Sequence, residues 1–295
     1  MARIRLDDGV RYEVRAGGDG PPLLLLHGFA GRGAWWAPHL AAFRRVRRTI
    51  VVDLLGHGRS DAPEDPRRHA VERQAADLAA ILERLDARHA DVLGYSLGAR
   101  IALRLAVDRP GIVGRLVLES PSAGIADSAA RLRRRQADER WVQLLGRGDL
   151  HAFVDAWLAQ PIFASRRGLA ARLRERDRAR YLDNRPAALA VSLTGAGQGV
   201  MEPVGPLLQR VGASTLVLAG ELDAAGTRRA ECVAAAIPDA RLAIVSGAGH
   251  APHLEAPVAF RRLVLGFLDP AIRDCLMPPR LDAGRRAPDA PRTRR

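Results

Sequence analysis

The sequence predicts an α/β fold built on a mostly parallel, doubly wound sheet. Short, largely apolar runs that fit strands buried on both faces recur along the chain, at residues 23–26, 49–52, 90–93, 116–118, 215–218 and 242–245. Helical apolar patterns separate several of these runs, at residues 71–85, 99–107 and 228–236. Strands that alternate with helices are typical of a parallel sheet covered by helices on both faces.

The two ends of the chain and one long interval depart from this alternation. Residues 4–14 alternate as an antiparallel hairpin does and lead into a glycine-rich turn. No strand-like run lies between Glu119 and about Gly212, so we expect a helical cap inserted after the strand near Leu116 and Leu118. Such an insertion would cover the carboxyl ends of the strands, where open α/β sheets bind ligands.

These observations predict a domain organisation with four parts. Residues 1–120 form the first part of the core, 121–195 the helical cap and 196–270 the second part of the core. Residues 271–295 are rich in Pro, Arg, Ala and Asp without apolar periodicity, and we expect this tail to be disordered.

Composition excludes several classes of protein. The formal net charge of +13 would favour nucleic-acid binding, but all 46 basic residues are arginine and part of the excess lies in the tail. We interpret this as a compositional bias and expect no nucleic-acid partner. The sequence has neither a secretion signal nor a long apolar run, so we expect a cytoplasmic protein without membrane insertion. Cys232 and Cys275 lie far apart, which argues against a disulfide framework or a metal site.

One pentapeptide, at residues 94–98, indicates a reactive serine. Gly94-Tyr95-Ser96-Leu97-Gly98 matches G-x-S-x-G, directly after one predicted strand and directly before a predicted helix. The glycines allow the sharp turn that lifts the serine hydroxyl clear of the sheet, and the helix N-terminus favours negative charge. We therefore predict Ser96 as a reactive serine.

A serine becomes reactive when an imidazole takes its proton and a carboxylate orients that imidazole. His250 and Asp223 both follow predicted strands, in the chain order this arrangement requires. Their alternative roles are to cap a loop and to cap the helix that begins near Thr227. Glu221 and His253 are the nearest substitutes, with less suitable positions.

Two backbone N–H groups are candidates for an oxyanion hole, the donor pair that stabilises a developing oxyanion. Phe29, after the first buried strand, would supply one, and Leu97, after the serine, would supply the other. The alternative is that Gly28 merely forms a turn. The loop that contains His57 is interpreted as structural, with no catalytic role for that histidine.

From about Leu23 to Leu268 the chain resembles the α/β-hydrolase superfamily. Within it, six stretches are similar to the 2-succinyl-6-hydroxy-2,4-cyclohexadiene-1-carboxylate synthases of menaquinone biosynthesis: residues 94–100, 138–142, 157–163, 189–197, 220–223 and 249–255. The resemblance implies an α/β-hydrolase fold and a lyase that removes pyruvate from an enolpyruvyl precursor without a cofactor. In such an enzyme the serine, aspartate and histidine act as a base on a ring C–H.

Arg100 gives an independent physical reason to favour an anionic substrate. It lies one helical turn after Ser96, and helical side chains lean toward the N-terminus, so its guanidinium should point back toward the serine. A buried arginine at that position needs an anion. The resemblance further implies that Tyr95 and the cap residues Arg134, Trp157 and Arg180 bind substrate.

The match has departures, and other functions remain open. Ala99 stands where the family usually has a second glycine, and Ala224 and Ala225 stand where it often has a lysine and an aromatic residue. A serine hydrolase of the same fold, acting on an ester or a carbon–carbon bond, is the nearest alternative function. A non-catalytic ligand receptor is a more remote one.

Overall fold

The structure is a computed structural model that describes residues 2–269 and residue 271. The predicted disordered tail therefore lies, apart from Ala271, outside the described residues. Among those residues, no helix is long and apolar enough to cross a membrane.

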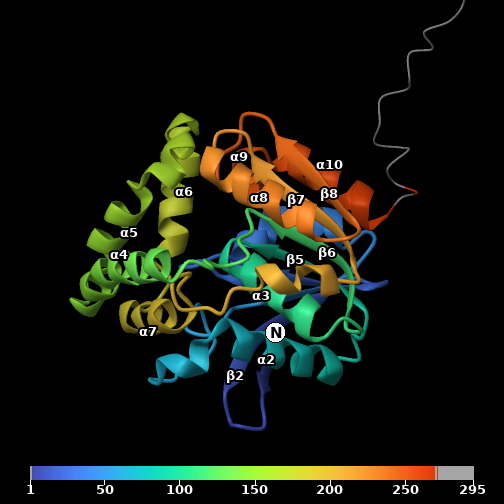
Figure 1. Cartoon of the computed structure of the whole chain (residues 1–295), viewed down its shortest axis with the longest axis horizontal. Helices are drawn as coiled ribbons and strands as arrows, with labels where there is room; N and C mark the ends of the chain where they lie inside the picture. The colour runs from blue at the N-terminus through green and yellow to red at the C-terminus, as the bar shows by residue number, and fades with distance from the viewer. Residues whose placement is uncertain (1, 270, 272–295) are drawn as a thin grey trace, which may run out of the picture.

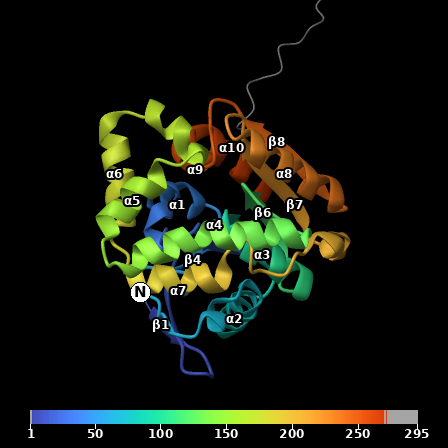
Figure 2. The same cartoon turned by 60° about the vertical axis from the view of Figure 1, so that its left-hand side comes forward.

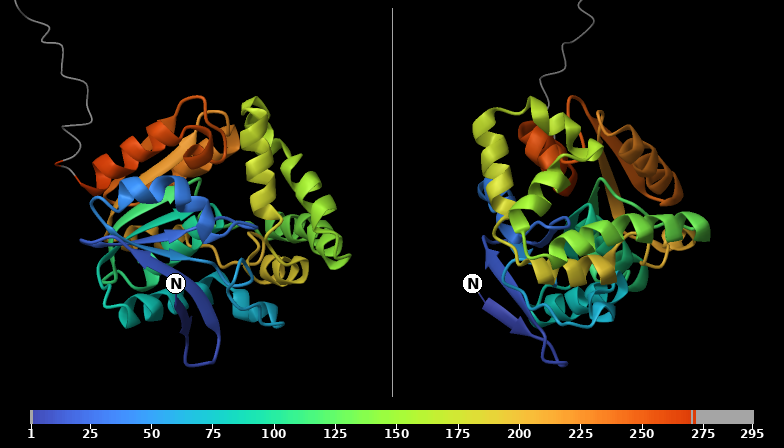
Figure 3. Two further views of the ribbon diagram at one scale, coloured as in Figure 1. Left: turned by 180° about the vertical axis from the view of Figure 1, so that it is seen from behind. Right: turned by 90° about the vertical axis from the view of Figure 1, so that its left-hand side faces the viewer.

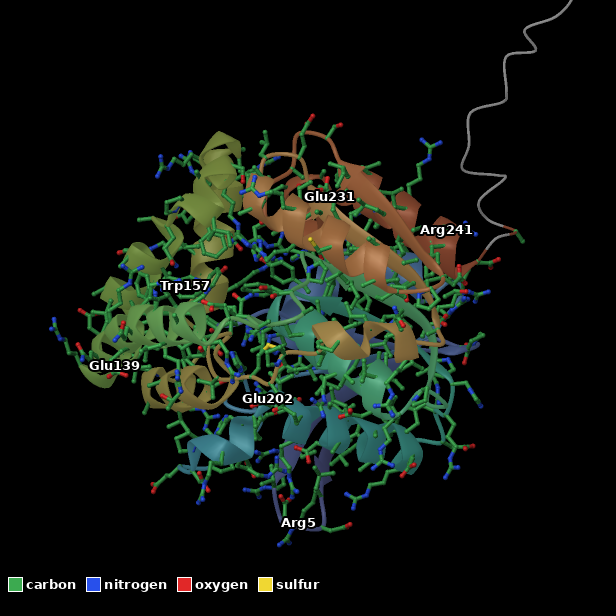
Figure 4. The ribbon with its side chains drawn as sticks, viewed as in Figure 1. Arg5, Glu139, Trp157, Glu202, Glu231 and Arg241 are labelled. Atoms are coloured by element: carbon green, nitrogen blue, oxygen red, sulfur yellow. The ribbon has the colours of Figure 1, made fainter. Side chains whose placement is uncertain are left out.

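An 8-stranded sheet forms the centre of the molecule, with the strand order β1-β2-β4-β3-β5-β6-β7-β8. Strands β3 to β8 run parallel, while β2 pairs antiparallel with both β1 and β4. The strands are β1 (Ala2–Arg5), β2 (Arg11–Gly17), β3 (Pro22–Leu26), β4 (Arg48–Val52), β5 (Ala90–Tyr95), β6 (Val113–Glu119), β7 (Ser214–Gly220) and β8 (Ala240–Val245). The predicted fold class and the N-terminal hairpin are confirmed; Arg5 marks the tip of that hairpin in Figure 4.

Helices cover both faces of the sheet, and alternate residues of one strand supply the two cores. On β3, Leu24 and Leu26 belong to the core beneath α2, α3 and α8, whereas Leu23 and Leu25 belong to the core shared with α1 and α10. Side chains of a strand point alternately to opposite faces, which explains the continuous apolar run. These helices are α1 (Ala37–Phe43), α2 (Val71–Arg84), α3 (Leu97–Asp108), α8 (Ala224–Ala236), α9 (Pro252–Glu255) and α10 (Pro257–Leu268).

One prediction about burial is wrong. The run at residues 242–245 was expected to be buried on both faces, but β8 is the edge strand and Leu242 and Ile244 are 38% and 40% exposed. An edge strand has a neighbour on one side only, so its apolar residues need not be enclosed.

Four helices follow β6 before the chain re-enters the sheet at β7, with no strand among the described residues between them. They lie beside the sheet in Figure 1 and in the view from behind in Figure 3, and α4 and α7 run side by side in Figure 2. They are α4 (Ser128–Gly146), α5 (Leu150–Leu158), α6 (Ala171–Tyr181) and α7 (Pro186–Ala196). Four short 3₁₀ helices complete the described structure: η1 (Gly33–Trp36), η2 (Pro66–His69), η3 (Pro161–Gly168) and η4 (Gly205–Arg210).

Candidate functional site

Ser96 occupies a strained turn between β5 and α3. Its backbone has φ 51° and ψ −104°, a left-handed conformation that a residue with a Cβ adopts at a cost. The flanking glycines permit this turn: a Cβ on Gly94 would lie 2.3 Å from the carbonyl oxygen of Gly98, and one on Gly98 would lie 2.4 Å from that of Leu26. The G-x-S-x-G pattern thus reflects backbone segments that touch.

The structure brings Ser96, His250 and Asp223 together. His250 Nε2 lies 3.2 Å from Ser96 Oγ, and His250 Nδ1 lies 2.7 Å from Asp223 Oδ2. An ionised carboxylate only accepts hydrogen bonds, so Nδ1 carries the proton and Nε2 is left to accept from the serine hydroxyl. This geometry suits transfer of the serine proton to the imidazole.

Asp223 both caps a helix and contacts His250. Its Oδ1 accepts from the N–H of Gly226 at 2.7 Å, at the start of α8, which begins at Ala224 rather than near Thr227. Burial alone would raise the pKa of Asp223, but the hydrogen bond from His250 and the amide of Gly226 outweigh burial and lower the pKa. The carboxylate is therefore ionised at neutral pH.

Two residues outside the sequence prediction hold the His250 loop. Glu255 accepts from the N–H of Gly249 at 2.8 Å through one carboxylate oxygen and from that of Ala251 at 3.1 Å through the other. Ser120 donates its hydroxyl hydrogen to the carbonyl of His250 at 2.8 Å. The backbone on both sides of the imidazole is thus fixed; Glu255 ends the stretch 249–255 that resembles the family, whereas no motif includes Ser120.

The alternative acid and base have other partners. Glu221 accepts from the N–H of Gly247 at 2.9 Å, and buried His253 pairs with buried Glu119 at 2.9 Å. His57 is fully buried and accepts from the N–H of Ala30 at 3.1 Å. None of these groups has a hydrogen bond to Ser96 within the described structure.

The two predicted oxyanion-hole residues lie on segments that meet at Ser96. Leu97 is the first residue of α3, and the N–H groups of a first helical turn have no acceptor within the helix. The loop before Phe29 approaches the serine closely, because a Cβ on Gly28 would lie 3.4 Å from Ser96 Cβ and 2.7 Å from the Tyr95 ring. Only glycine allows this approach.

A cavity of about 310 Å³ opens beside Ser96 and His250. Among the described residues, its charged lining consists of arginines, with no aspartate or glutamate: Arg100, Arg134 and Arg229. Phe29, Tyr95, Trp157, Phe163 and Leu193 give it apolar walls, and Gln160, Gln198, Ser120 and Ser122 add neutral polar groups. Such a lining suits a ligand with a compact apolar body and several negative charges.

Arg100 contributes a half-buried positive charge that has no carboxylate in ion-pair contact among the described residues. Its Nη1 donates to the carbonyl of Ala196 at 2.8 Å. Burial, together with the charge of Arg134, lowers the pKa of Arg100 to about 10. The guanidinium is still charged at neutral pH, so it presents a positive charge to the cavity that Asp138 and Glu72 offset only in part.

The other residues expected to bind substrate fall into two groups. Tyr95, Arg134 and Trp157 line the cavity. Arg134 Nε donates a hydrogen bond to Asp138 at 2.9 Å. Trp157, labelled in Figure 4, packs edge-on against Phe29 with ring centres 5.2 Å apart. Arg180 does not line the cavity. It is half-buried on α6, where burial and neighbouring Arg176 lower its pKa.

Arg229 lines the cavity but was not predicted from the sequence. It belongs to α8, six residues after Asp223, in a chain where arginine is common. No spacing rule singles it out. Within the described part of the chain, no cluster of His, Cys, Asp and Glu could hold a metal ion.

Comparisons with known proteins show which family the chain is similar to. The family model for the alpha/beta hydrolase fold matches residues 21–257. A Bacillus subtilis (strain 168) relative, provisionally named a 2-succinyl-6-hydroxy-2,4-cyclohexadiene-1-carboxylate synthase, is 35% identical over 90% of this chain and 97% of its own length. The synthase of that name from Salmonella typhimurium is 32% identical over 80% of this chain and 89% of its own. The solved structure of MenH from S. aureus has a TM-score of 0.82 at 30% identity and covers 87% of this chain and 97% of that one.

Proposed function

The chain belongs to the α/β-hydrolase fold family and, within it, to the 2-succinyl-6-hydroxy-2,4-cyclohexadiene-1-carboxylate synthases, which are lyases, and from this premise we propose its reaction. The enzyme eliminates pyruvate from 2-succinyl-5-enolpyruvyl-6-hydroxy-3-cyclohexene-1-carboxylate. This substrate carries a carboxylate on its succinyl chain, one on its ring and one in its enolpyruvyl group.

One observation carries the proposal: the serine and imidazole open onto a cavity whose charged lining residues, within the part of the chain that the structure describes, are all arginines. A neutral ester would leave the half-buried guanidinium of Arg100 without an anion in contact, which is costly. A substrate with several carboxylates supplies the missing charges and can bind them with paired hydrogen bonds.

In the proposed mechanism, Ser96, His250 and Asp223 act together as a base. Ser96 gives its proton to His250 Nε2 and removes the ring proton, while Asp223 holds the imidazole. The electrons of the C–H bond at ring carbon 2 form a double bond between carbons 2 and 3. The existing double bond between carbons 3 and 4 moves to carbons 4 and 5, and the C–O bond from carbon 5 to the enolpyruvyl group breaks. His250 then returns a proton to the departing enolate oxygen, and the enol rearranges to pyruvate. The step consumes no water.

Neighbouring groups stabilise the charge that develops. The N–H groups of Phe29 and Leu97 are proposed to donate to the oxygen that becomes negative in the transition state. Arg100 and Arg134 bind carboxylates of the substrate, and Tyr95 and Trp157 shape the cavity around its ring. The segment 121–195 acts as a cap that keeps water from the reacting atoms.

Replacement of Ser96 tests the reaction. Purified protein mixed with the enolpyruvyl substrate should release pyruvate, measured with lactate dehydrogenase, and the Ser96→Ala variant should lose most of that rate, by about 100-fold or more. Circular dichroism should show the variant folded. Unchanged pyruvate release by a folded Ser96→Ala variant would contradict the mechanism.

The same preparation separates elimination from hydrolysis. A serine hydrolase would turn over p-nitrophenyl esters quickly through an acyl-enzyme and would leave the enolpyruvyl substrate intact. We expect the opposite result, with pyruvate release far faster than ester cleavage. Binding of the substrate without turnover would instead identify a receptor.

A further inference from the structure

The three arginines that line the cavity come from three different helices, and Arg229 is the one on α8. It lies on α8, which packs beside β7 and β8 and carries Glu231, labelled in Figure 4. Arg100 lies on α3 and Arg134 on α4. The three guanidinium groups therefore approach one cavity from three separate helices.

The nearest acid cannot satisfy Arg229. Asp223 Oδ2 lies 4.0 Å from Arg229 Nη2, at the outer limit for an ion pair, and the same oxygen already accepts from His250 at 2.7 Å. The other carboxylate oxygen is bound to the N–H of Gly226 at 2.7 Å. No side-chain hydrogen bond of Arg229 was found to any residue that the structure describes, so its donors are free for a ligand.

Partial burial and the positive charge of Arg134 both favour the binding of an anion at Arg229. Its side chain is 37% exposed, and burial together with the charge of Arg134 lowers the pKa of Arg229, against the pull of Asp223. Arg134 differs, because both oxygens of Asp138 accept from it, at 2.9 and 3.1 Å. Arg229 is thus a charged lining residue whose donors have no close acceptor among the described residues.

The position of Arg229 indicates which part of a substrate it would meet. Its Nη2 lies 4.0 Å from the Asp223 oxygen that contacts His250 Nδ1, and Arg229 and His250 both line the cavity, so Arg229 lies at the end of the cavity next to the Asp223–His250 pair. In the proposed reaction, His250 returns the proton to the departing oxygen, so the leaving group must lie next to the imidazole. The leaving group carries its own carboxylate.

We propose that Arg229 is a specificity-determining residue that binds the carboxylate of the enolpyruvyl leaving group. The assignment rests on the proposed function. Arg100 and Arg134 then serve the carboxylates that stay on the ring product. A substrate without the leaving-group carboxylate would lose this contact alone.

The test compares Arg229→Gln with Arg229→Lys and with the control Arg228→Gln. Arg228 is the exposed neighbour on the same helix and does not line the cavity. Three quantities are measured: kcat/KM for the enolpyruvyl substrate, the Kd of the ring product, which lacks the enolpyruvyl group, and the inhibition constant of pyruvate.

Arg229→Gln should lower kcat/KM by roughly 10- to 100-fold, the effect of one charged hydrogen bond, and raise the inhibition constant of pyruvate similarly. The Kd of the ring product should change less than about twofold, because the contacts of this product with the cavity do not include Arg229. Arg229→Lys should recover part of the loss, and Arg228→Gln should resemble the wild-type protein.

Each other outcome has a distinct meaning. If the wild-type protein releases pyruvate and Arg229→Gln behaves like Arg228→Gln, the inference is wrong while the proposed function stands. If Arg229→Gln lowers kcat without weakening pyruvate inhibition, Arg229 acts only through Asp223, and the inference is again wrong. If the wild-type protein releases no pyruvate, the proposed function fails and this assignment fails with it.

Discussion

Glu255 shows how a single side chain can position a reacting group without touching it. Its two carboxylate oxygens accept from the N–H groups of Gly249 and Ala251, the residues on either side of His250. Hydrogen bonds to an ionised acceptor are stronger than neutral ones. This carboxylate therefore restricts the loop at the residue whose imidazole must meet both Ser96 and Asp223.

We predict that Glu255→Gln lowers kcat by about 10- to 100-fold with a much smaller change in KM, because a small displacement of the imidazole slows proton transfer more than binding. Steady-state pyruvate release measures both constants. Glu221→Gln is the matched control. Glu221 also accepts from a backbone N–H of the same loop, but from that of Gly247, which lies three residues before His250, whereas Gly249 lies directly before it. Equal effects of the two variants would contradict a specific positioning role.

At the scale of residues, the sequence predicts those positions whose geometry requires a particular residue type. Ser96 could be found because the elbow brings backbone atoms so close that glycines must flank it. Arg229 could not, because its place in the cavity depends on how separate helices pack. Glu255 lies in the stretch 249–255 that resembles the family, but its contacts to Gly249 and Ala251 depend on a loop conformation that the sequence pattern does not specify. Arg180 was expected near the substrate, yet it lies outside the cavity lining, among other charged residues of α6.

At the scale of elements, strands buried on both faces of the sheet are predicted by their continuous apolar runs. The same kind of run led to a wrong prediction of burial for β8, the strand at the edge of the sheet. The apolar run of β8 resembles the buried ones, although Leu242 and Ile244 are partly exposed. Whether a strand is central or at an edge depends on the order of strands in the sheet, which a single run does not specify. The helices after β6 were predicted only as a segment because arginine-rich helices have weak apolar periodicity.

Asn184 connects the segment after β6 to two loops of the core. It lies between α6 and α7, is buried, and donates to the carbonyl of Ala30 at 2.8 Å. Its side-chain oxygen accepts from the N–H of Gly58 at 3.0 Å. One amide therefore links the helical segment to the loop that carries Phe29.

We predict that Asn184→Ala lowers the free energy of unfolding by about 1 to 3 kcal/mol, because it leaves buried backbone groups without partners. It should also lower kcat/KM, since the loop that carries Phe29 loses its connection. Urea unfolding and pyruvate release measure the two effects. Asp183→Ala is the control: Asp183 forms a surface ion pair with Arg32, which contributes at most about 1 kcal/mol. A larger loss from Asp183→Ala than from Asn184→Ala would contradict the prediction.

At the scale of the whole molecule, buried histidines couple stability to pH. His39 is 1% exposed on α1, and burial, with the nearby charges of His253 and Arg261, lowers its pKa to about 3. Burial is likewise the largest cause that lowers the pKa of His27, His57 and His69. Each of these side chains is neutral in the folded protein at pH values where it would be protonated in an unfolded chain.

The sign of the effect follows from proton binding. Between the unfolded pKa of about 6.5 and the folded pKa of about 3, the unfolded chain binds the extra proton at His39 and the folded protein does not. The contribution of His39 to stability should therefore fall as the pH drops through this range, by about 1.4 kcal/mol per pH unit. His39→Gln should remove one of these contributions and flatten the dependence of the unfolding free energy on pH between about 6 and 4, as measured by urea unfolding at several pH values. The exposed His151, replaced in the same way, is the control. A slope that His39→Gln leaves as steep as that of the control would show that His39 takes up its proton without unfolding.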